Sequence, residues 1–197
     1  NAILVSDLKF ERIIFDEFFN MNECQPYHDT QTGGNLSDFK DNKILMTIGD
    51  YNSYEDLIFQ GNNNPQNINS LIGKIISIDE KTKEYKILSM GHRNPQGLYY
   101  DKEHNVIYST DHGPQGGDEI NFANMNSKKM HNFGWPISSY GGRYNVDKSV
   151  KSNYYKSHSA FGFEEPLFSF VPSIAISELI KLPDSFSINW TDNFIIS

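Results

Sequence analysis

The sequence predicts an all-β fold made of repeated small sheets, and three observations support this. Short apolar runs rich in Ile, Tyr and Phe alternate with turn-forming residues, which is typical of strands. A polar turn containing Asn precedes an apolar run at 41–46, 104–109 and 192–197. Finally, no long segment has the spacing of an amphipathic helix. Together these patterns indicate a modular β protein.

The expected strands can be placed in chain order. Three of them follow the Asn-containing turns, and the others are apolar runs bounded by polar residues. The predicted strands are Ala2–Val5, Arg12–Phe15, Lys43–Ile48, Ile72–Ile78, Tyr85–Leu88, Val106–Ser109, Pro166–Phe170 and Asn193–Ile196. Two segments rich in Asn, Ser and Lys, Asn52–Ser70 and Tyr144–Glu165, are predicted to be solvated connections.

Composition and charge exclude several classes of partner. The 197 residues are 14% aromatic, which suits a β protein, and the formal net charge of -8 opposes binding to nucleic acid. No apolar run approaches the ~20 residues of a membrane span. The single cysteine, Cys24, cannot form an intrachain disulfide and so indicates no compartment. The chain begins at Asn1 rather than Met, which predicts a processed or truncated start.

Two polar motifs concentrate the residue types that build a binding site. Residues 91–98 read GHRNPQGL, and residues 112–121 read HGPQGGDEIN. They combine a fixed cation, amides, imidazoles, loop carbonyls and two acids. Because an out-and-back pair of strands would return both loops to the same rim of a sheet, we expect their side chains to converge on one ligand.

These motifs also carry a resemblance. Together with the later NFGWP at 132–136, they resemble the signature blocks of the soluble glucose/sorbosone dehydrogenase family. Weaker similarity extends from about Phe10 to Ser197. The resemblance implies a six-bladed β-propeller that oxidises aldose sugars with pyrroloquinoline quinone (PQQ) and calcium. Electrons would pass to an external acceptor, and the compartment would be the periplasm or the exterior.

The resemblance assigns roles to particular residues. PQQ is a planar tricarboxylated quinone, so Arg93, Asn94 and Gln96 would line it with a charged fork and amides. The carbonyls of Gly113 and Pro114 would bind calcium, which prefers oxygen ligands. His112 and Asp118 match further positions of the cofactor loop. Alternatively, each short motif could mark only a turn.

The base that accepts the sugar's hydroxyl proton has more than one candidate position. Relatives place a His ahead of a strand that ends in an acid, and an imidazole oriented by a carboxylate suits this role. The acid corresponds to Asp50, but the ungapped register puts Gln31 at the His position and Asn35 at that of an Arg. An amide cannot act as a base. Either His28 moves inward to serve as the base, or it is an ordinary loop histidine.

Other aromatic and imidazole groups have simpler expectations. The remaining histidines lack the short spacing of a zinc site, and His104 and His158 are expected to face solvent. Trp135 and Trp190 are predicted to pack within the blades. Phe168 matches an aromatic that walls the cofactor in relatives, although a Phe in an apolar strand more often belongs to the core.

The domain prediction is one partial propeller. At ~40 to 50 residues per compact repeat plus inserted loops, 1–197 would hold about three to four central blades. Such an array cannot close its own ring, so another chain or segment would complete it. Two functions remain open. The chain is a PQQ- and calcium-dependent aldose dehydrogenase or a fragment of one, or it is a non-catalytic propeller module for binding or assembly.

Overall fold

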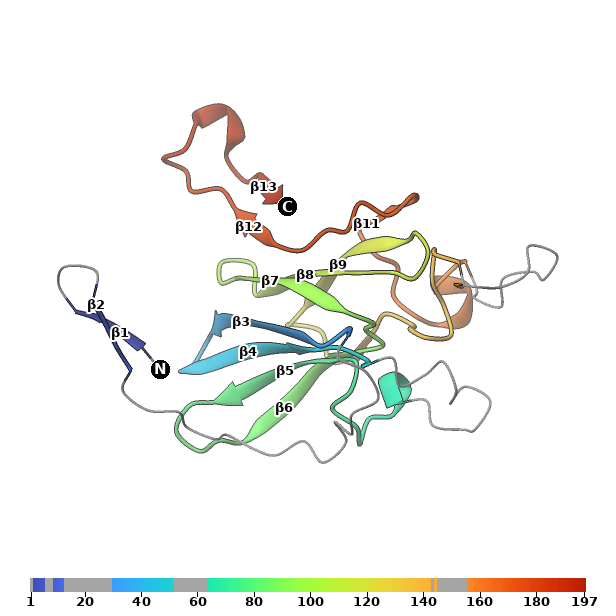
Figure 1. Cartoon of the computed structure of the whole chain (residues 1–197), viewed down its shortest axis with the longest axis horizontal. Coiled ribbons are helices and arrows are strands. Elements are labelled where there is room, and N and C mark those ends of the chain that lie inside the picture. The colour runs from blue at the N-terminus through green and yellow to red at the C-terminus, as the bar shows by residue number, and fades with distance from the viewer. Residues whose placement is uncertain (1, 6–8, 13–29, 52–63, 143, 145–155) are drawn as a thin grey trace.

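The computed structural model describes residues 2–5, 9–12, 30–51, 64–142, 144 and 156–197. Within them the chain is almost entirely β, and the expected all-β class is confirmed. Two larger antiparallel sheets lie against each other, and a two-stranded hairpin stands at each end of the chain (Figure 1). The three 3-10 turns are Asn64–Gln66, Ser159–Phe161 and Ile188–Trp190.

The first sheet is a four-stranded meander extended by one short strand. Its order is β10-β6-β5-β4-β3, and β10 pairs parallel to β6 while the other neighbours are antiparallel. The second sheet has the order β11-β9-β8-β7, entirely antiparallel. Strand bounds are β3 Gly33–Phe39, β4 Lys43–Ile48, β5 Lys74–Asp79, β6 Tyr85–Met90, β7 Pro95–Asp101, β8 Val106–Asp111, β9 Asp118–Asn124, β10 His131–Asn132 and β11 Phe168–Phe170.

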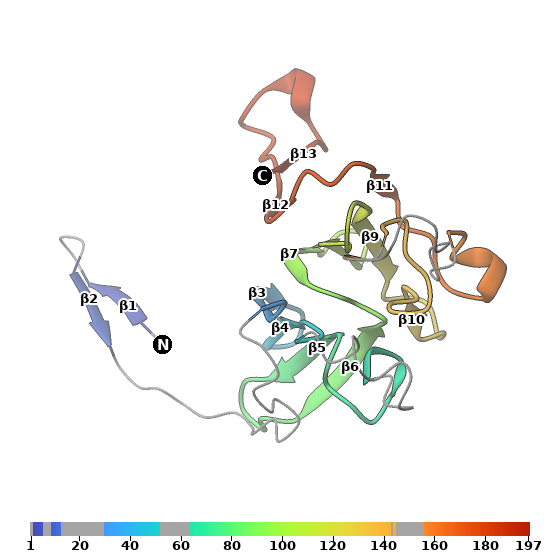
Figure 2. The same cartoon turned by 45° about the vertical axis from the view of Figure 1, so that its right-hand side comes forward.

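The two terminal hairpins are β1–β2 and β12–β13. Strands β1 (Ala2–Val5) and β2 (Lys9–Arg12) pair with each other, and so do β12 (Leu179–Lys181) and β13 (Phe194–Ile196). The first hairpin stands apart from both large sheets in both views, and the second lies beyond the β7–β9 sheet (Figures 1 and 2). Each large sheet with its short added strand has the form of a propeller blade.

The prediction that a strand follows each Asn-containing turn is confirmed. Asp41 and Asn42 both have positive φ in the three-residue turn that joins β3 to β4, and β4 begins at the next residue. Asn105 is also left-handed and precedes β8, and Asp192 is left-handed before β13. The Asn and Asp side chains tolerate this backbone conformation better than most residues.

Several predicted elements were shifted or missed. The segment expected as a strand at Arg12–Phe15 appears as β2, ending at Arg12, with its remainder outside the described residues. Strands β3, β7 and β9 were not predicted, because polar residues interrupt their apolar content. Strand β7 starts with Pro95, a position where the missing N–H costs the ladder nothing. The two polar motifs are therefore partly strand.

The core lies between the two large sheets. Leu45 and Ile75 from the first sheet are buried against Leu98 and Ile107 from the second, and Phe133 closes the cluster. A second cluster, formed by Ile48, Leu71, Ile76 and Ile78, covers the other face of the first sheet. Because β5 is buried on both faces, its apolar run is continuous rather than alternating. This packing holds the ends of β4, β6 and β8 close together.

Candidate functional site

The carboxylate of Asp111, at the end of β8, organises the turn that carries Arg93. Its Oδ1 accepts a hydrogen bond from the Asn94 N–H at 2.7 Å, and its Oδ2 accepts one from the Arg93 N–H at 3.1 Å. The same Oδ2 lies 3.2 Å from Nδ1 of His92, whose side chain is fully buried. Sequence reasoning did not assign Asp111 to the site. The available signal was its place as an acid directly after a repeated strand.

The Arg93 guanidinium joins the two polar motifs. Its Nη1 donates to the carbonyl of His112 at 3.0 Å and to that of Gly113 at 2.8 Å. The guanidinium also lies over the Trp135 ring, 5.5 Å from the ring centroid, as a cation–π pair. The loops at 91–94 and 112–113 therefore meet at one rim of the molecule.

Asp50 lies at the same rim. Its carboxylate is fully buried, and its Oδ2 accepts a hydrogen bond from Nε1 of Trp135 at 2.7 Å. Its N–H donates to the Arg93 carbonyl at 2.8 Å. Trp135, predicted only to pack within the blades, is buried and also links Asp50 to Arg93. The strand-ending acid thus sits in the same network as the fixed cation.

Backbone hydrogen bonds join Gln31 and Thr32 to the residues on either side of Asp50. The Tyr51 N–H donates to the Gln31 carbonyl at 3.1 Å, and the Gly49 N–H donates to the Thr32 carbonyl at 2.9 Å. A Cβ on Gly49 would lie 1.9 Å from the Gln31 carbonyl oxygen, so only glycine allows this approach. His28 falls outside the described residues. The backbone of Gln31 therefore lies beside the segment that carries Asp50, and whether Gln31 or His28 occupies the base position stays a prediction.

Asn94 and Gln96 form an amide pair that faces β3. Oδ1 of Asn94 accepts from Nε2 of Gln96 at 2.8 Å and from the Gly33 N–H at 3.2 Å. Nδ2 of Asn35 donates to the Gln96 carbonyl at 2.6 Å and to Oε2 of Glu178 at 3.0 Å. These contacts connect the motif on β7 to the neighbouring blade and fix the orientation of both amides.

Asp118 holds two loops together, and the structure gives it partners within the protein. Its Oδ1 accepts from the Gly113 N–H at 3.1 Å. Its Oδ2 accepts from the Ser173 hydroxyl at 2.6 Å and from the N–H groups of Ile174 and Ala175 at 3.0 and 2.7 Å. Within the described residues Asp118 thus positions the loop, and its expected contact with a cofactor stays a prediction.

The loop at 112–117 turns back tightly on itself. A Cβ on Gly113 would lie 2.2 Å from the Gly117 carbonyl oxygen and 2.5 Å from that of Gly116. Pro114 is buried, and the Gly113 carbonyl is the one that accepts from Arg93. The half-buried His112 uses Nε2 to reach the Ile176 carbonyl. The loop thus gathers backbone oxygens next to a fixed cation.

The void enclosed by Arg93, Asp111, Gly113, Glu119 and Trp135 has a volume of about 10 Å³. This is room for one water molecule and far too little for a tricyclic quinone. A flat ligand therefore does not fit within this void and would have to lie outside it.

A buried acid and a buried imidazole adjoin this void. Burial, followed by the nearby Asp111 charge, raises the pKa of Glu119 well above its ordinary value. Nε2 of His158 lies 3.4 Å from Oε1 of Glu119, and burial lowers the pKa of His158. Both shifts favour the neutral forms. The expectation that His158 faces solvent is wrong, since it is 1% exposed beneath the stacked Tyr140 ring.

Three further aromatic and imidazole expectations can be compared with the structure. His104 does lie at the surface, where it pairs with Asp101. Trp190 was expected to pack within a blade, but it is 54% exposed. Phe168 is 56% exposed and contacts Phe170, so it is neither core nor a wall of the rim described above. Both exposed aromatics belong to the C-terminal part of the chain, whose outer face carries no neighbouring sheet in the described structure.

The atoms at the rim that could bind a metal ion are backbone carbonyl oxygens rather than a cluster of carboxylates. Among the described residues, no group of three or more His, Cys, Asp or Glu side chains is placed to hold a metal ion. Backbone carbonyls of the 112–117 loop are the oxygen donors that remain for a hard cation. In the part of the chain that the structure covers, no helix is long and apolar enough to cross a membrane.

The paired four-stranded sheets and their polar rim define part of a β-propeller with a candidate ligand site on one face. The sequence matches the family described as glucose/sorbosone dehydrogenase over residues 4–197. The chain therefore belongs to the glucose/sorbosone dehydrogenase family, as its motifs predicted.

Two curated relatives illustrate this membership. The chain is 32% identical over 165 residues to an uncharacterised protein of Synechocystis sp., which covers 75% of this chain and 37% of the relative. It is 36% identical over 100 residues to the aldose sugar dehydrogenase YliI of Escherichia coli, covering 51% of this chain and 25% of the relative. The chain thus spans between a quarter and two fifths of these relatives.

Two solved structures show the same fold. A glucose dehydrogenase superposes with a TM-score of 0.70 at 23% identity, covering 99% of this chain and 54% of that one. The PQQ-bound aldose sugar dehydrogenase of Streptomyces coelicolor superposes with a TM-score of 0.52 at 20% identity, covering 75% of this chain and 38% of that one. These likenesses establish the propeller architecture.

Proposed function

We propose that this chain is part of a PQQ- and calcium-dependent aldose dehydrogenase that oxidises a sugar at its anomeric carbon. The observation that carries the proposal is the reach of Arg93 across to the carbonyls of His112 and Gly113, which brings both motif loops to one rim. Family membership supports it. So do the activity named for the Escherichia coli relative and the quinone named for the Streptomyces structure.

The residues at the rim carry the chemical groups that PQQ and calcium bind. Arg93, Asn94, Gln96 and His112 would hold PQQ on the outer side of the rim, through a guanidinium, two amides and an imidazole. When bound, the quinone supplies the acceptor for the sugar's hydride, and calcium neutralises its negative charge. The carbonyls of Gly113 and Pro114 are oxygen donors of the type that calcium takes. Asp118 would act through the loop that it positions.

Oxidation at the anomeric carbon removes a hydride from carbon and a proton from its hydroxyl, so the reaction needs a base. We assign the base to His28, with Asp50 as the acid that orients it. Asp50 is buried at the rim and already accepts from Trp135. In this assignment the Asp50 carboxylate accepts from an imidazole N–H, which would hold the ring in the tautomer that accepts a proton.

The competing proposal is a non-catalytic propeller module that has lost the base. The observation that favours it is the backbone pairing of Gln31 with Tyr51, which brings a residue that cannot act as a base next to the segment of Asp50. Such a module could keep the loop at 112–117 and bind calcium without oxidising a sugar. Fold likeness does not decide between the two, because chemistry depends on the residues of the site.

One experiment separates the two proposals. The protein that contains this chain is mixed with calcium, PQQ, an aldose and an artificial electron acceptor, and the quinone absorbance is followed. The enzyme proposal expects reduction in the wild type and none in His28→Ala. Arg93→Lys should bind PQQ about tenfold more weakly, because Lys lacks the planar fork. Lys102→Ala, on an exposed turn, is the matched control.

The outcomes differ clearly between the proposals. Calcium binding without PQQ binding supports the module and overturns the enzyme. PQQ binding with full activity in His28→Ala overturns the assignment of the base alone. If neither ligand binds, both proposals fail and only the family and architecture stand.

We also propose the setting of this activity. The compartment would be the periplasm or the exterior, the substrate a small sugar, and the electron acceptor an external molecule. Residues 1–197 would form a partial propeller that a further segment or another chain completes. The exposed apolar side chains of the C-terminal hairpin support this arrangement, because they offer a face for another blade.

A further inference from the structure

A second hollow lies between the two large sheets, at the opposite end of the strands from the rim. Lys43 at the start of β4 lines it, whereas Asp50 at the rim follows the end of the same strand. Seven residues of extended chain separate the two positions by about 20 Å. The hollow has a volume of about 310 Å³. This is the size at which sites for small molecules begin.

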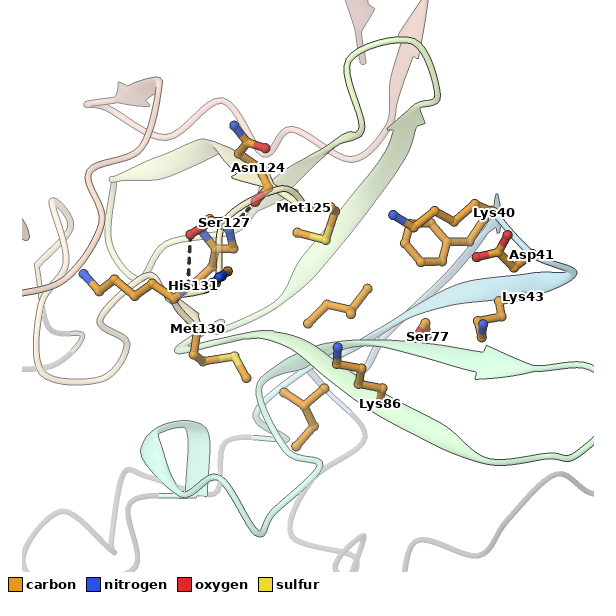
Figure 3. A pocket seen from close by; sticks show the side chains of 15 residues that line it. Lys40, Asp41, Lys43, Ser77, Lys86, Asn124, Met125, Ser127, Met130 and His131 are labelled. Atoms are coloured by element: carbon orange, nitrogen blue, oxygen red, sulfur yellow. Dashed lines mark hydrogen bonds between the residues drawn. The ribbon is translucent and has the colours of Figure 1, made fainter.

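The charge of this hollow is opposite to that of the whole chain. The chain carries a formal net charge of -8, yet the lining has five ammonium groups and a single carboxylate, that of Asp41. Three of the lysines come from the first sheet and its β3–β4 turn, and two come from the turn after β9. They are Lys40, Lys43, Lys86, Lys128 and Lys129. Figure 3 shows the side chains of Lys40 and Lys86 directed into the space between the sheets.

These ammonium groups are not neutralised by the protein. Among the described residues, none of the five lies within ion-pair distance of a carboxylate. Lys40 donates to the amide oxygen of Asn105, a neutral partner. The N–H groups of Thr82 and Lys81 lower the pKa of the half-buried Asp79, and the charge of Lys43 lowers it further. An anion bound among these ammonium groups would reduce their mutual repulsion.

The inner wall of the hollow is apolar. Phe39 and Leu88 are half-buried there, and Met125 and Met130 project their thioethers from the second sheet and its following turn (Figure 3). Methionine side chains adapt to ligands of different shape. His131 also lines the hollow, but Glu164 and the Asn124 carbonyl occupy both of its ring nitrogens. An apolar wall beneath a ring of cations suits a ligand that has both an apolar body and more than one negative charge.

We propose that this hollow is a binding site for a small multivalent organic anion, with its apolar body against Phe39, Leu88 and the two methionines and its charge among the lysines. Lysine ammonium groups bind phosphoryl and carboxyl oxygens as point charges and do not demand a fixed geometry. The site is separate from the rim and does not depend on the function proposed for it.

The methionines provide a direct test. The full chain is labelled with ¹³C at the methionine methyls, of which the sequence has five. It is then titrated with phenyl phosphate, which has both an aromatic ring and a charged group. Inorganic phosphate supplies the charge alone, and benzyl alcohol supplies the ring alone. We expect the methyl signals of Met125 and Met130 to shift to a plateau as phenyl phosphate is added. The methyl signals of Met46 in β4 and Met90 in β6 should stay unchanged, which would show that the fold is intact. Phenyl phosphate should bind about tenfold more tightly than either fragment.

A pair of variants tests the role of the lysines. Lys86→Gln combined with Lys129→Gln should weaken phenyl phosphate binding about tenfold and leave benzyl alcohol binding unchanged. Lys102→Gln, which removes a lysine outside the hollow, should change neither. Three results would overturn the proposal. The first is that the methyl signals of Met125 and Met130 do not shift when phenyl phosphate is added. The second is that inorganic phosphate and phenyl phosphate bind with equal affinity. The third is that the double variant binds phenyl phosphate as tightly as the wild type.

Discussion

At the scale of single residues, Asp118 shows how a motif acid can hold two distant segments of the chain together. Its two oxygens accept hydrogen bonds from Gly113 and from the segment at 173–175, and its side chain is 1% exposed. Sequence similarity correctly marked the residue as part of the loop. It could not show the direction of the carboxylate, because the partner segment lies more than fifty residues away in the chain.

We predict that Asp118→Ala lowers the free energy of unfolding by about 2 kcal/mol, because buried N–H groups lose their acceptor. Urea denaturation measures this change. Asp184→Ala, at an exposed position, should stay within about 0.5 kcal/mol of the wild type. Equal stability of the two variants would show that water replaces the carboxylate at no cost.

Glu119 predicts a pH dependence of stability. Burial and Asp111 raise its pKa in the folded protein above the ordinary value of 4.5. An unfolded chain therefore releases this proton at a lower pH than the folded one. The stabilising contribution is complete below about pH 4.5 and is lost as the pH rises through the folded pKa. His158 has the opposite effect. Because its pKa is lowered in the folded protein, it reduces the free energy of unfolding only when the pH falls below about 6.5.

The variant Glu119→Gln isolates this effect. We expect it to gain stability relative to the wild type as the pH rises from about 5 to about 8, because the amide has no proton to lose. Urea denaturation at several pH values measures the difference. Glu80→Gln, in an exposed turn, serves as the control and should show no such trend. A constant difference between Glu119→Gln and the wild type would contradict the prediction.

At the scale of elements, the two polar motifs are built from strand ends and tight loops. The sequence indicated loops at 91–98 and 112–121, but Pro95 opens β7 and Asp118 opens β9. Their strand content is hidden because the residues that face the core alternate with polar residues that serve the rim. The hairpin geometry that returns both loops to one rim was predictable from antiparallel pairing.

The loop at 112–117 depends on a glycine at 113. A Cβ there would lie 2.2 Å from the Gly117 carbonyl oxygen, so Gly113→Ala must displace the backbone. We predict a loss of about 2 kcal/mol in unfolding free energy and weaker calcium binding. Calorimetric titration with calcium and urea denaturation measure the two effects.

Gly142→Ala is the matched control for that loop, because Gly142 bridges to Gln115 in the same region but has no atom closer than 3.7 Å to its added methyl. It should leave both stability and calcium binding close to those of the wild type. Similar losses in the two variants would show that the region tolerates no side chain at all, and the argument from the Gly113 contact would fail.

At the scale of the whole molecule, the C-terminal part leaves large apolar side chains uncovered. Ile188 is 89% exposed, Val171 66% and Phe186 59%. Apolar groups gathered in this way mark a surface that binds another protein surface. In a propeller, each blade covers the apolar face of the next. This part of the chain therefore supports the proposed completion of the ring.

We predict that the 197-residue polypeptide alone associates through this face. Sedimentation velocity should show concentration-dependent oligomers, and Ile188→Glu with Trp190→Glu should shift the distribution towards monomers. Ile68→Glu, which changes an exposed apolar residue of another region, is the control. A polypeptide that is monomeric at all concentrations would contradict the prediction.

The sequence by itself determined the all-β class, the strand starts after the Asn turns and the family, because periodicity and short motifs depend on neighbouring residues. It also placed Asp50 at a strand end. Only the tertiary structure decided that Arg93 spans to the Gly113 carbonyl, that Trp135 bonds Asp50, that Asp118 holds two loops and that His158 is buried. Those outcomes depend on contacts between segments distant in the chain, and a local pattern carries no information about which distant group will arrive.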